Sequence, residues 1–374
     1  MKITDVEAVI LRLPNLDDIA CDGTQDALIV RIHTDEGITG VGEADSSPYV
    51  CKTIIEAPPS HAIARGLKHV LIGQDPFDVE MLWQRMYEAS IYYGRRGAAI
   101  HAISGVDIAL WDIIGKATGR PVAQMLGGAY RDRVRVYAST LMPERPDEVA
   151  ARVRPLVEQG YTAVKLGWGP LGRNLDLDVA LVRAAREAVG PRVDLMIDIG
   201  LMYDAATAVR MVRLFEPFNL FWLEEPLPPD DLAGYARLAD AVDTRIAAGE
   251  EDATIYGFRD LVERGHVDVI QPDIARCGGF TEARKIGHLA AEHNLLCVPH
   301  AFSTGILVSA SLHFAATLRR GNLAEFSVQE SPFVRDLLRT PFRLEADGTV
   351  RVPTGPGLGI ELDEDVLERY RYHS

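Results

Sequence analysis

Several features that mark other classes of protein are missing from this sequence of 374 residues. No two of its four cysteines form a C-x-x-C pair, and the sequence has no Walker loop for nucleotide phosphates. We therefore expect free thiols in a reducing compartment, and neither a disulfide framework nor a zinc site built from cysteine pairs. The four cysteines are Cys21, Cys51, Cys277 and Cys297.

Long apolar runs and blocks of like charge are also missing. We find no stretch with the roughly 18 apolar residues of a membrane-spanning helix, and residues 1–5 have no signal-peptide core. The 54 acidic residues outnumber the 39 basic ones, and the formal net charge of −15 disfavours non-specific binding to nucleic acid or to anionic membranes. We therefore expect a cytoplasmic protein that binds neither.

The first third of the chain reads as an α+β domain. Residues 2–13, 27–32 and 38–42 have strand-like patterns, and a turn signal at residues 34–37 predicts an antiparallel meander. Apolar residues recur at helical spacing from about residue 56 to residue 119. We assign residues 1–128 to this domain.

The pattern changes at residue 134, where short apolar runs begin to alternate with amphipathic segments. Alternating strands and helices favour a parallel sheet, and about eight repeats favour a closed (β/α)8-type barrel. We predict this barrel over residues 129–340, with a tail at 341–374 that returns to the first domain. The eight predicted strands are residues 134–139, 162–166, 194–197, 220–223, 246–248, 267–271, 295–298 and 323–326.

Polar side chains follow five consecutive predicted strands at the point where each strand ends. Because active-site residues of a βα barrel sit at the carboxyl ends of the strands, we expect all five around one mouth. Any one of them reads equally well as a helix cap or a solvated charge, but five in register favour a site. They are Asp198, Glu224, Glu250, Asp273 and His300, spaced 23 to 27 residues apart.

Three of these residues predict a metal site. The carboxylates of Asp198, Glu224 and Glu250 would converge and repel one another, so that at least one would be protonated unless a cation were bound. Oxygen ligands with room for water and substrate suit Mg²⁺. The adjacent acidic residues are expected to face outward or to cap helices; they are Glu225, Glu251 and Asp252.

The other two residues predict a base. Asp273 and His300 come from neighbouring strands. An aspartate that accepts a hydrogen bond from one ring N–H of a histidine fixes its tautomer and raises its basicity. The pair therefore predicts a histidine that removes a proton from a substrate held at the metal.

Two stretches resemble the mandelate racemase and muconate lactonizing group of the enolase superfamily. Residues 102–112, AISGVDIALWD, with their continuation to residue 128, resemble the helix that joins the capping domain to the barrel in that group. Residues 195–226, which contain LMID and LEEP, resemble its metal-ligand signature. The resemblance covers nearly the whole chain, and it implies a capping domain whose loops choose the substrate and a homo-oligomeric state.

The resemblance also implies roles for single residues. Asp198, Glu224 and Glu250 match its Mg²⁺ ligands, and Asp273 with His300 matches its base dyad. Glu325, at the end of the eighth predicted strand, matches an acid that hydrogen-bonds the substrate carboxylate. Lys165 would face the barrel interior and add a positive charge to the same carboxylate oxygens.

The chain departs from the group at two positions. The group usually carries Lys-x-Lys at the end of the second strand, where its second lysine is the base on the opposite face; here the residues are Lys165, Leu166 and Gly167. Gly167 cannot take a proton. The second departure is Gly200, where an Asn or His is usual, and this predicts open space beside the substrate.

These features predict removal of the proton next to a carboxylate, with the resulting charge stabilised by the metal. One base suits β-elimination, so we expect an acid-sugar dehydratase that forms a 2-keto-3-deoxy acid. A racemase, epimerase or cycloisomerase with Lys165 or a cap tyrosine as second base stays open, as does a barrel that binds an acidic ligand without turnover. Residues expected to bind substrate, or equally well to lie on the surface, are Lys52, Tyr92, Tyr93 and Arg95, with Arg276 as a further candidate.

Overall fold

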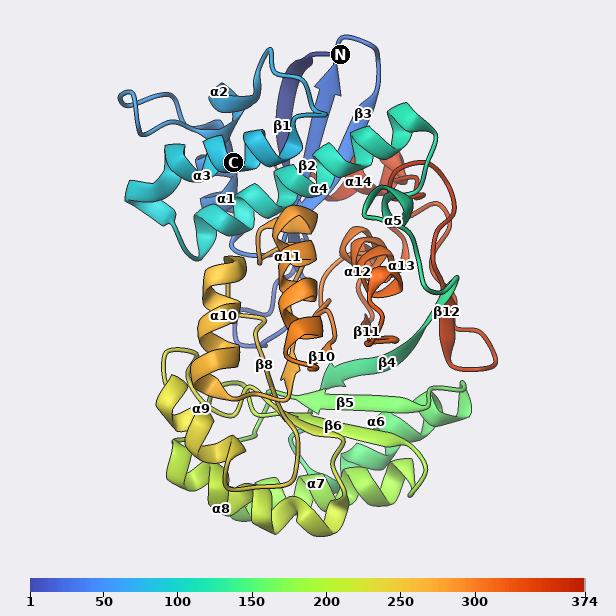
Figure 1. Ribbon diagram of the computed structural model, residues 1–374. Coiled ribbons are helices and arrows are strands. Elements are labelled where there is room, and N and C mark those ends of the chain that lie inside the picture. The colour runs from blue at the N-terminus through green and yellow to red at the C-terminus, as the bar shows by residue number, and fades with distance from the viewer. Residues whose placement is uncertain (373–374) are drawn as a thin grey trace.

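A three-stranded antiparallel sheet opens the chain in the computed structural model, which describes residues 1–372. Its strands pair in chain order: β1 (Ile3–Arg12), β2 (Asp26–Thr34) and β3 (Thr39–Ala44). Together with five helices this sheet forms a capping domain on top of a barrel (Figure 1). The helices are α1 (Pro48–Glu56), α2 (Leu67–Leu71), α3 (Val79–Gly94), α4 (Ala98–Thr118) and α5 (Val122–Met125).

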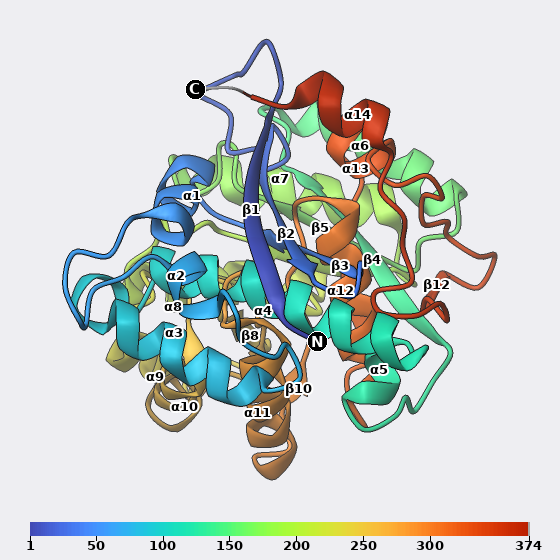
Figure 2. The ribbon, with the colours of Figure 1, turned by 90° about the horizontal axis from the view of Figure 1, so that it is seen from above.

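Helix α4 is the centre of the cap. Glycines in β3 allow the sheet to approach it closely, since a Cβ placed on Gly42 would lie 2.0 Å from the carbonyl oxygen of Gly105. By length and composition α4 is apolar enough to cross a membrane, so the expectation that no stretch is long and apolar enough was wrong. Of the most apolar part of this helix, 89% is buried inside the protein. Seen from above, helices α1 to α3 lie on one side of the sheet (Figure 2).

The barrel has eight parallel strands, as the repeating pattern predicted, although several are shorter than the apolar runs. The ladder is continuous from β11 through β4 to β10. The remaining gap is bridged where the Glu325 N–H donates to the Pro299 carbonyl, 3.4 Å away. The strands are β4 (Arg133–Leu141), β5 (Ala163–Gly167), β6 (Asp194–Asp198), β7 (Trp222–Glu224), β8 (Ile246–Ala248), β9 (Val269–Ile270), β10 (Leu296–Cys297) and β11 (Leu323–Ser327).

Helices cover the outside of the barrel strands. Several begin with a side-chain cap; the Asn174 side chain, for example, accepts hydrogen bonds from two N–H groups of the first turn of α7. These helices are α6 (Pro146–Glu158), α7 (Leu175–Val189), α8 (Ala205–Phe215) with the short 3₁₀ turn Glu216–Phe218, α9 (Leu232–Ala239), α10 (Thr254–Gly265), α11 (Gly279–Glu292) and α12 (Gly305–Thr317).

Inward-facing side chains form two layers inside the barrel. The lower layer is a separate apolar cluster to which each of the eight strands, or the residue directly after it, contributes one side chain. Its members are Tyr137, Ala163, Met196, Trp222, Ala247, Val269, Val298 and Leu323. Residues two positions further along a strand point to the same face. The upper layer is therefore polar, and it contains Ser139, Lys165, Asp198, Glu224, Gln271, His300 and Glu325. The alternation brings Asp198, Glu224 and His300 to one face, and the length of the βα units sets the spacing between them.

The C-terminal segment joins the barrel to the cap. After α13 (Pro332–Arg335), strand β12 (Thr349–Arg351) pairs antiparallel with β4 of the barrel. The chain then reaches the cap sheet, where α14 (Glu364–Tyr370) lies beside β1 and the N–H of Tyr372 donates to Ile10. The boundaries at residues 128 and 340 stay predictions, since the tail contacts both domains.

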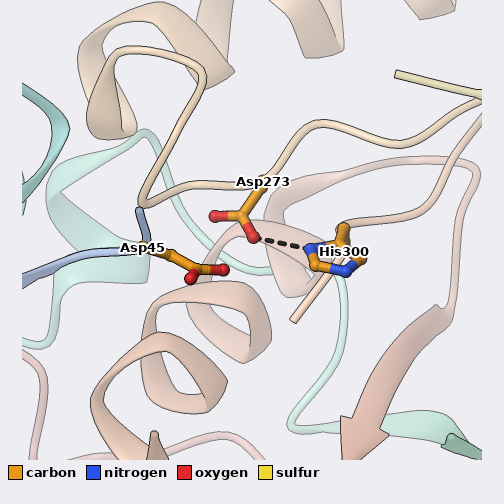
Figure 3. Close-up of side chains that lie close together, drawn as sticks. All are labelled: Asp45, Asp273 and His300. Carbon is orange, nitrogen blue, oxygen red and sulfur yellow. Dashed lines mark hydrogen bonds and ion pairs between the residues drawn. The ribbon is translucent and has the colours of Figure 1, made fainter. Parts of the chain in front are cut away.

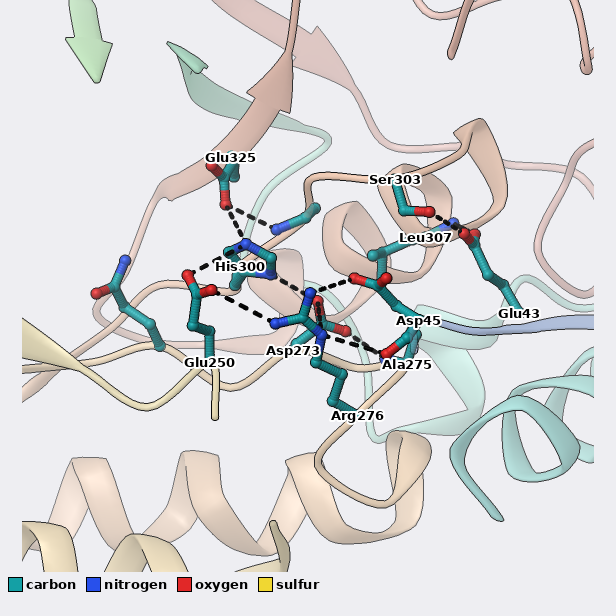
Figure 4. Close-up of polar contacts among 12 residues, drawn as sticks. Glu43, Asp45, Glu250, Asp273, Ala275, Arg276, His300, Ser303, Leu307 and Glu325 are labelled. Carbon is teal, nitrogen blue, oxygen red and sulfur yellow. Dashed lines mark hydrogen bonds and ion pairs between the residues drawn. The ribbon is translucent and has the colours of Figure 1, made fainter. Parts of the chain in front are cut away.

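A buried carboxylate fastens the cap to the barrel. Glu43, in β3, accepts hydrogen bonds from the hydroxyls of Ser303 and Thr304, both at 2.6 Å, and from the N–H groups of Thr304 and Leu307 (Figure 4). These N–H groups belong to the start of α12, where the backbone has no partners within the helix. The contact fixes the cap at Ser303, three residues after His300.

We expect Gly42→Ala to destabilise the protein by about 1–3 kcal/mol, because the new methyl would collide with backbone of α4 that cannot move aside. Denaturant midpoints measure the effect. Gly37→Asn, in the preceding turn, is the control, since a Cβ there meets nothing within 4 Å and asparagine tolerates a positive φ. Equal midpoints for the two variants would contradict this packing.

Candidate active site

A cavity of about 430 Å³ lies at the mouth of the barrel, between the strand ends and the cap. Its polar lining comes largely from the upper layer of the barrel, and the cap contributes residues 20–23 of the loop between β1 and β2. Glu224 and Asp273 lie directly behind this lining. The predicted site residues that line the cavity are Lys165, Asp198, Glu250, Arg276, His300 and Glu325.

Three carboxylates converge at one side of the cavity. Each of Asp198, Glu224 and Glu250 is buried and offers an oxygen, and these oxygens lie within 4.8 Å of one another. Burial and the neighbouring Glu224 raise the pKa of Asp198 well above its usual range. Burial also raises the pKa of Glu224, against the opposing charge of Lys165. Such a cluster of hard oxygen donors could hold a divalent cation.

Lys165 lies between two carboxylates. Its Nζ is 2.9 Å from Oε1 of Glu325 and also contacts Oε1 of Glu224. Burial lowers the pKa of Lys165, but the two glutamates more than offset this and raise the pKa well above its usual range. The lysine therefore carries a fixed positive charge in the middle of the site.

His300 and Asp273 form a hydrogen-bonded pair, with Nδ1 2.6 Å from Oδ2 (Figure 3). The other ring nitrogen, Nε2, faces Glu250 at 3.2 Å and Glu325 at 3.6 Å. Burial lowers the pKa of His300, but Glu250, Glu325 and Asp273 together raise it to about 10. At this pKa the ring carries a proton on both nitrogens, with the Nδ1–H held by Asp273. Glu250 is the largest of the causes that raise the pKa, so a cation bound to Glu250 would lower it and free Nε2 to take a proton from a bound molecule.

Arg276 connects this pair to the cap. Its Nη2 is 2.9 Å from Asp45, at the end of the cap sheet, and its Nη1 is 3.4 Å from Glu250 (Figure 4). Asp45 also lies close to the dyad and offers a second possible metal-binding group with Asp273 and His300. The cluster around Asp198 is the better candidate for a hard divalent cation, because its donors are three carboxylates and all three are buried.

Gly167 leaves room for a neighbouring carboxylate. It pairs with Asp198 in the adjacent strand, and a Cβ at position 167 would lie 2.6 Å from Cβ of Asp198. The next residue, Trp168, has φ 56°, and its ring packs against Gly200, where a Cβ would lie 2.9 Å from two ring carbons. The expectation of open space at Gly200 is therefore wrong, because the Trp168 ring fills it.

Residues 167–172 also match the G-x-G-x-x-G pattern of dinucleotide-binding turns. Both carboxylate oxygens of Asp178 lie 3.1 Å from the N–H of Gly172. The Asp178 carboxylate already accepts the hydrogen bond from the N–H group that a phosphate would need, and its negative charge would repel a phosphate. The match therefore does not form a phosphate site.

The structure corrects the predicted substrate contacts from the cap helices. Lys52 donates to the carbonyl of Ala8 and to Glu56, and the Tyr93 hydroxyl donates to the carbonyl of Arg65. Tyr92 and Arg95 are exposed. None of these four side chains lines the cavity, because the β1–β2 loop covers the mouth instead.

Other residues of the site were missed or misread in the sequence. Glu225 was expected to face outward, but it is 3% exposed and accepts hydrogen bonds from the hydroxyl of Tyr235 and the N–H of Gly249. Trp222 and Gln271 were not singled out, yet both donate to Glu224. Both residues stand at inward-facing positions of the strand pattern, and that pattern could have identified them from the sequence.

Two family models match most of the chain. The mandelate racemase / muconate lactonizing enzyme N-terminal domain matches residues 3–127, and the enolase C-terminal domain-like model matches residues 148–366. The chain belongs to the mandelate racemase and muconate lactonizing enzyme family of the enolase superfamily. This confirms the resemblance predicted from the sequence.

Named members of the family are similar over almost the full chain. A D-galactarolactone cycloisomerase from Agrobacterium fabrum is 36% identical, over 92% of this chain and 91% of its own. An L-rhamnonate dehydratase from Saccharopolyspora erythraea is 34% identical, over 92% of this chain and 85% of its own. The 3,6-anhydro-D-galactonate cycloisomerase structure from Zobellia galactanivorans is 34% identical, covers 100% of both chains and has a TM-score of 0.91.

We expect divalent metal binding to weaken as the pH falls. The raised pKa values of Asp198 and Glu224 mean that these groups keep protons to a higher pH than free carboxylic acids, so a cation must displace protons. Calorimetry with Mg²⁺ at about pH 6 and pH 8, in buffers of different ionisation enthalpy, measures both affinity and proton release. Asp194→Asn, in the same strand outside the site, is the control. An affinity independent of pH would contradict this account.

Proposed function

We propose that this enzyme catalyses β-elimination of water from an acid sugar, with His300 removing the proton next to the substrate carboxylate. The product would be a 2-keto-3-deoxy acid. One observation carries this proposal: a single histidine base, oriented by Asp273, faces a cluster of three carboxylates in one cavity, while Gly167 stands where a second base would be.

We further propose that Asp198, Glu224 and Glu250 hold Mg²⁺. Their donors are all oxygens, they are buried, and their mutual repulsion is relieved by a cation. When bound, the ion would act as a Lewis acid toward the substrate carboxylate. The homo-oligomeric state and the cytoplasmic location stay predictions.

The remaining residues would bind and orient the substrate. The Lys165 ammonium, held by Glu325 and Glu224, would sit beside the substrate carboxylate and stabilise the negative charge that builds up there. Glu325 is fixed by the N–H of Ala301, which donates to its Oε2 at 2.8 Å. Arg276 and the loop at residues 20–23 would contact the distal hydroxyls or a second carboxylate.

The proton can be followed through one elimination. Nε2 of His300 takes the α-proton, a carbon–carbon double bond forms, and the β-carbon–oxygen bond breaks. His300 then gives the same proton to the departing hydroxyl, which leaves as water, and the enol becomes a ketone. Because one group serves both steps, the proton and the hydroxyl would leave from one face.

A second candidate is a cycloisomerase that opens a ring by the same elimination. If the leaving oxygen belongs to a lactone, it departs as a carboxylate and needs no acid to protonate it. This fits Gly167, which lines the cavity but has no side chain that could supply an acid. Of the three relatives described above, two are named as cycloisomerases and one as a dehydratase. The leaving group of the substrate decides between an isomerase and a lyase.

We expect pooled mono- and diacid sugars and their lactones, incubated with enzyme and Mg²⁺ in D₂O, to give new methylene signals of a 2-keto-3-deoxy acid. Proton NMR measures this and names the substrate. His300→Asn should lower the rate by about 10²- to 10⁴-fold, the typical contribution of a general base. The exposed His293 is the control, and His293→Asn should leave the rate unchanged.

Turnover of an open acid supports the dehydratase, and turnover of a lactone or cyclic ether alone supports the cycloisomerase. Loss of the α-proton signal without a new product would mean exchange or racemisation and would contradict elimination; inversion at that carbon would contradict the one-base proposal. A ligand that binds tightly and is recovered unchanged would favour a binding protein instead.

A further inference from the structure

The two oxygens of Glu224 have different surroundings. Oε2 accepts two hydrogen bonds, from the indole Nε1–H of Trp222 at 2.7 Å and from the amide Nε2 of Gln271 at 2.8 Å. Oε1 contacts Lys165. A carboxylate offers about four lone-pair sites over its two oxygens. Both sites of Oε2 are therefore taken, and one site of Oε1 is left for a further partner.

The two donors are held rigidly. Trp222 belongs to the apolar layer of the barrel, and its ring packs edge-on against Tyr137 with centroids 5.6 Å apart. Trp222 and Gln271 are 0% and 1% exposed. Turning the Glu224 carboxylate would leave two buried donors without partners, which is costly in an interior that water does not reach.

We propose that Trp222 and Gln271 are positioning residues that restrict Glu224 to binding a cation through Oε1 alone, and that they thereby select Mg²⁺ over Ca²⁺. This inference rests on the metal site proposed above. Ca²⁺ accepts roughly six to eight oxygens and often takes both oxygens of one carboxylate, whereas Mg²⁺ demands an octahedron of about six short bonds. A carboxylate limited to one oxygen suits Mg²⁺ and removes a contact that Ca²⁺ would use.

The other two carboxylates are only partly occupied, and each of their oxygens keeps a free lone-pair site. Oδ1 of Asp198 accepts the N–H of Gly200 at 2.9 Å. Glu250 has Oε1 3.4 Å from Arg276 and Oε2 3.2 Å from His300. Three carboxylates that each give one oxygen would leave about three octahedral positions for water and substrate.

The test is the ratio of the Mg²⁺ and Ca²⁺ dissociation constants, measured by calorimetry on the full chain. Trp222→Phe removes the indole donor and keeps an aromatic ring in the apolar layer. Loss of a partner that orients a metal ligand typically costs about 10- to 100-fold in affinity. We expect Mg²⁺ to bind at least about tenfold more weakly while Ca²⁺ binding is unchanged or tighter.

Trp83→Phe is the matched control, because it also removes a buried indole hydrogen bond, from α3 of the cap to the carbonyl of Gly278 at the start of α11, and this bond does not involve the three carboxylates. Its ratio should equal that of the unaltered protein. Gln271→Met removes the second donor, and it should shift the ratio in the same direction. It keeps the inference testable if Trp222→Phe does not fold.

Parallel weakening of both ions in the folded variants, or an unchanged ratio, would overturn the inference. A different result would overturn the metal site itself: an unaltered protein that binds no divalent cation, or one that binds Mg²⁺ as well after Glu224→Gln. The two failures are therefore distinguishable.

Discussion

Mutual repulsion among buried carboxylates is the constraint on which this site depends. Asp198, Glu224 and Glu250 place their oxygens within 4.8 Å of one another in a buried place. Removing charges from water is unfavourable, and converging like charges add to that cost. The fold tolerates the arrangement because cationic side chains and hydrogen-bond donors surround it, with Lys165 on one flank and Arg276 on the other.

The barrel supplies the rigidity that holds these charges. Seven of the eight strands place an apolar side chain in a lower layer and, two residues later, a polar one in an upper layer; after β8 that position is Gly249, and Glu250 follows it. The members of the apolar layer are between 0% and 5% exposed, and their packing holds the strands that carry the side chains above. Trp222 belongs to the lower layer and donates to Glu224 in the upper one. Packing and electrostatics are therefore joined in one residue.

Much of this architecture follows from the sequence because it depends on short-range regularities. Strand ends recur at a fixed spacing, and the residues at those ends, such as Asp198 and His300, share one direction in any parallel barrel. The stretch at residues 102–112 and the metal-ligand stretch at residues 195–226 also predicted the family. The long apolar helix α4 was underestimated, because its glycines and two aspartates interrupt a simple count of apolar residues.

The remaining details depend on contacts between segments far apart in the chain. Polar residues at 92–97, across the end of α3, suggested substrate contacts, but only the packing of the cap places the β1–β2 loop over the mouth. Gly200 suggested open space, and the Trp168 ring that fills it follows a different strand. The buried position of Glu225 depends on Tyr235, ten residues away.

The central claim is that the three-carboxylate cluster is the metal site of this barrel. It is tested most directly by anomalous X-ray diffraction from crystals grown with Mn²⁺ in place of Mg²⁺. The account predicts one strong anomalous peak bonded to a single oxygen from each of Asp198, Glu224 and Glu250, on the side of the cavity that Nε2 of His300 faces. A peak among Asp45, Asp273 and His300 instead, or no peak at the barrel mouth, would contradict it.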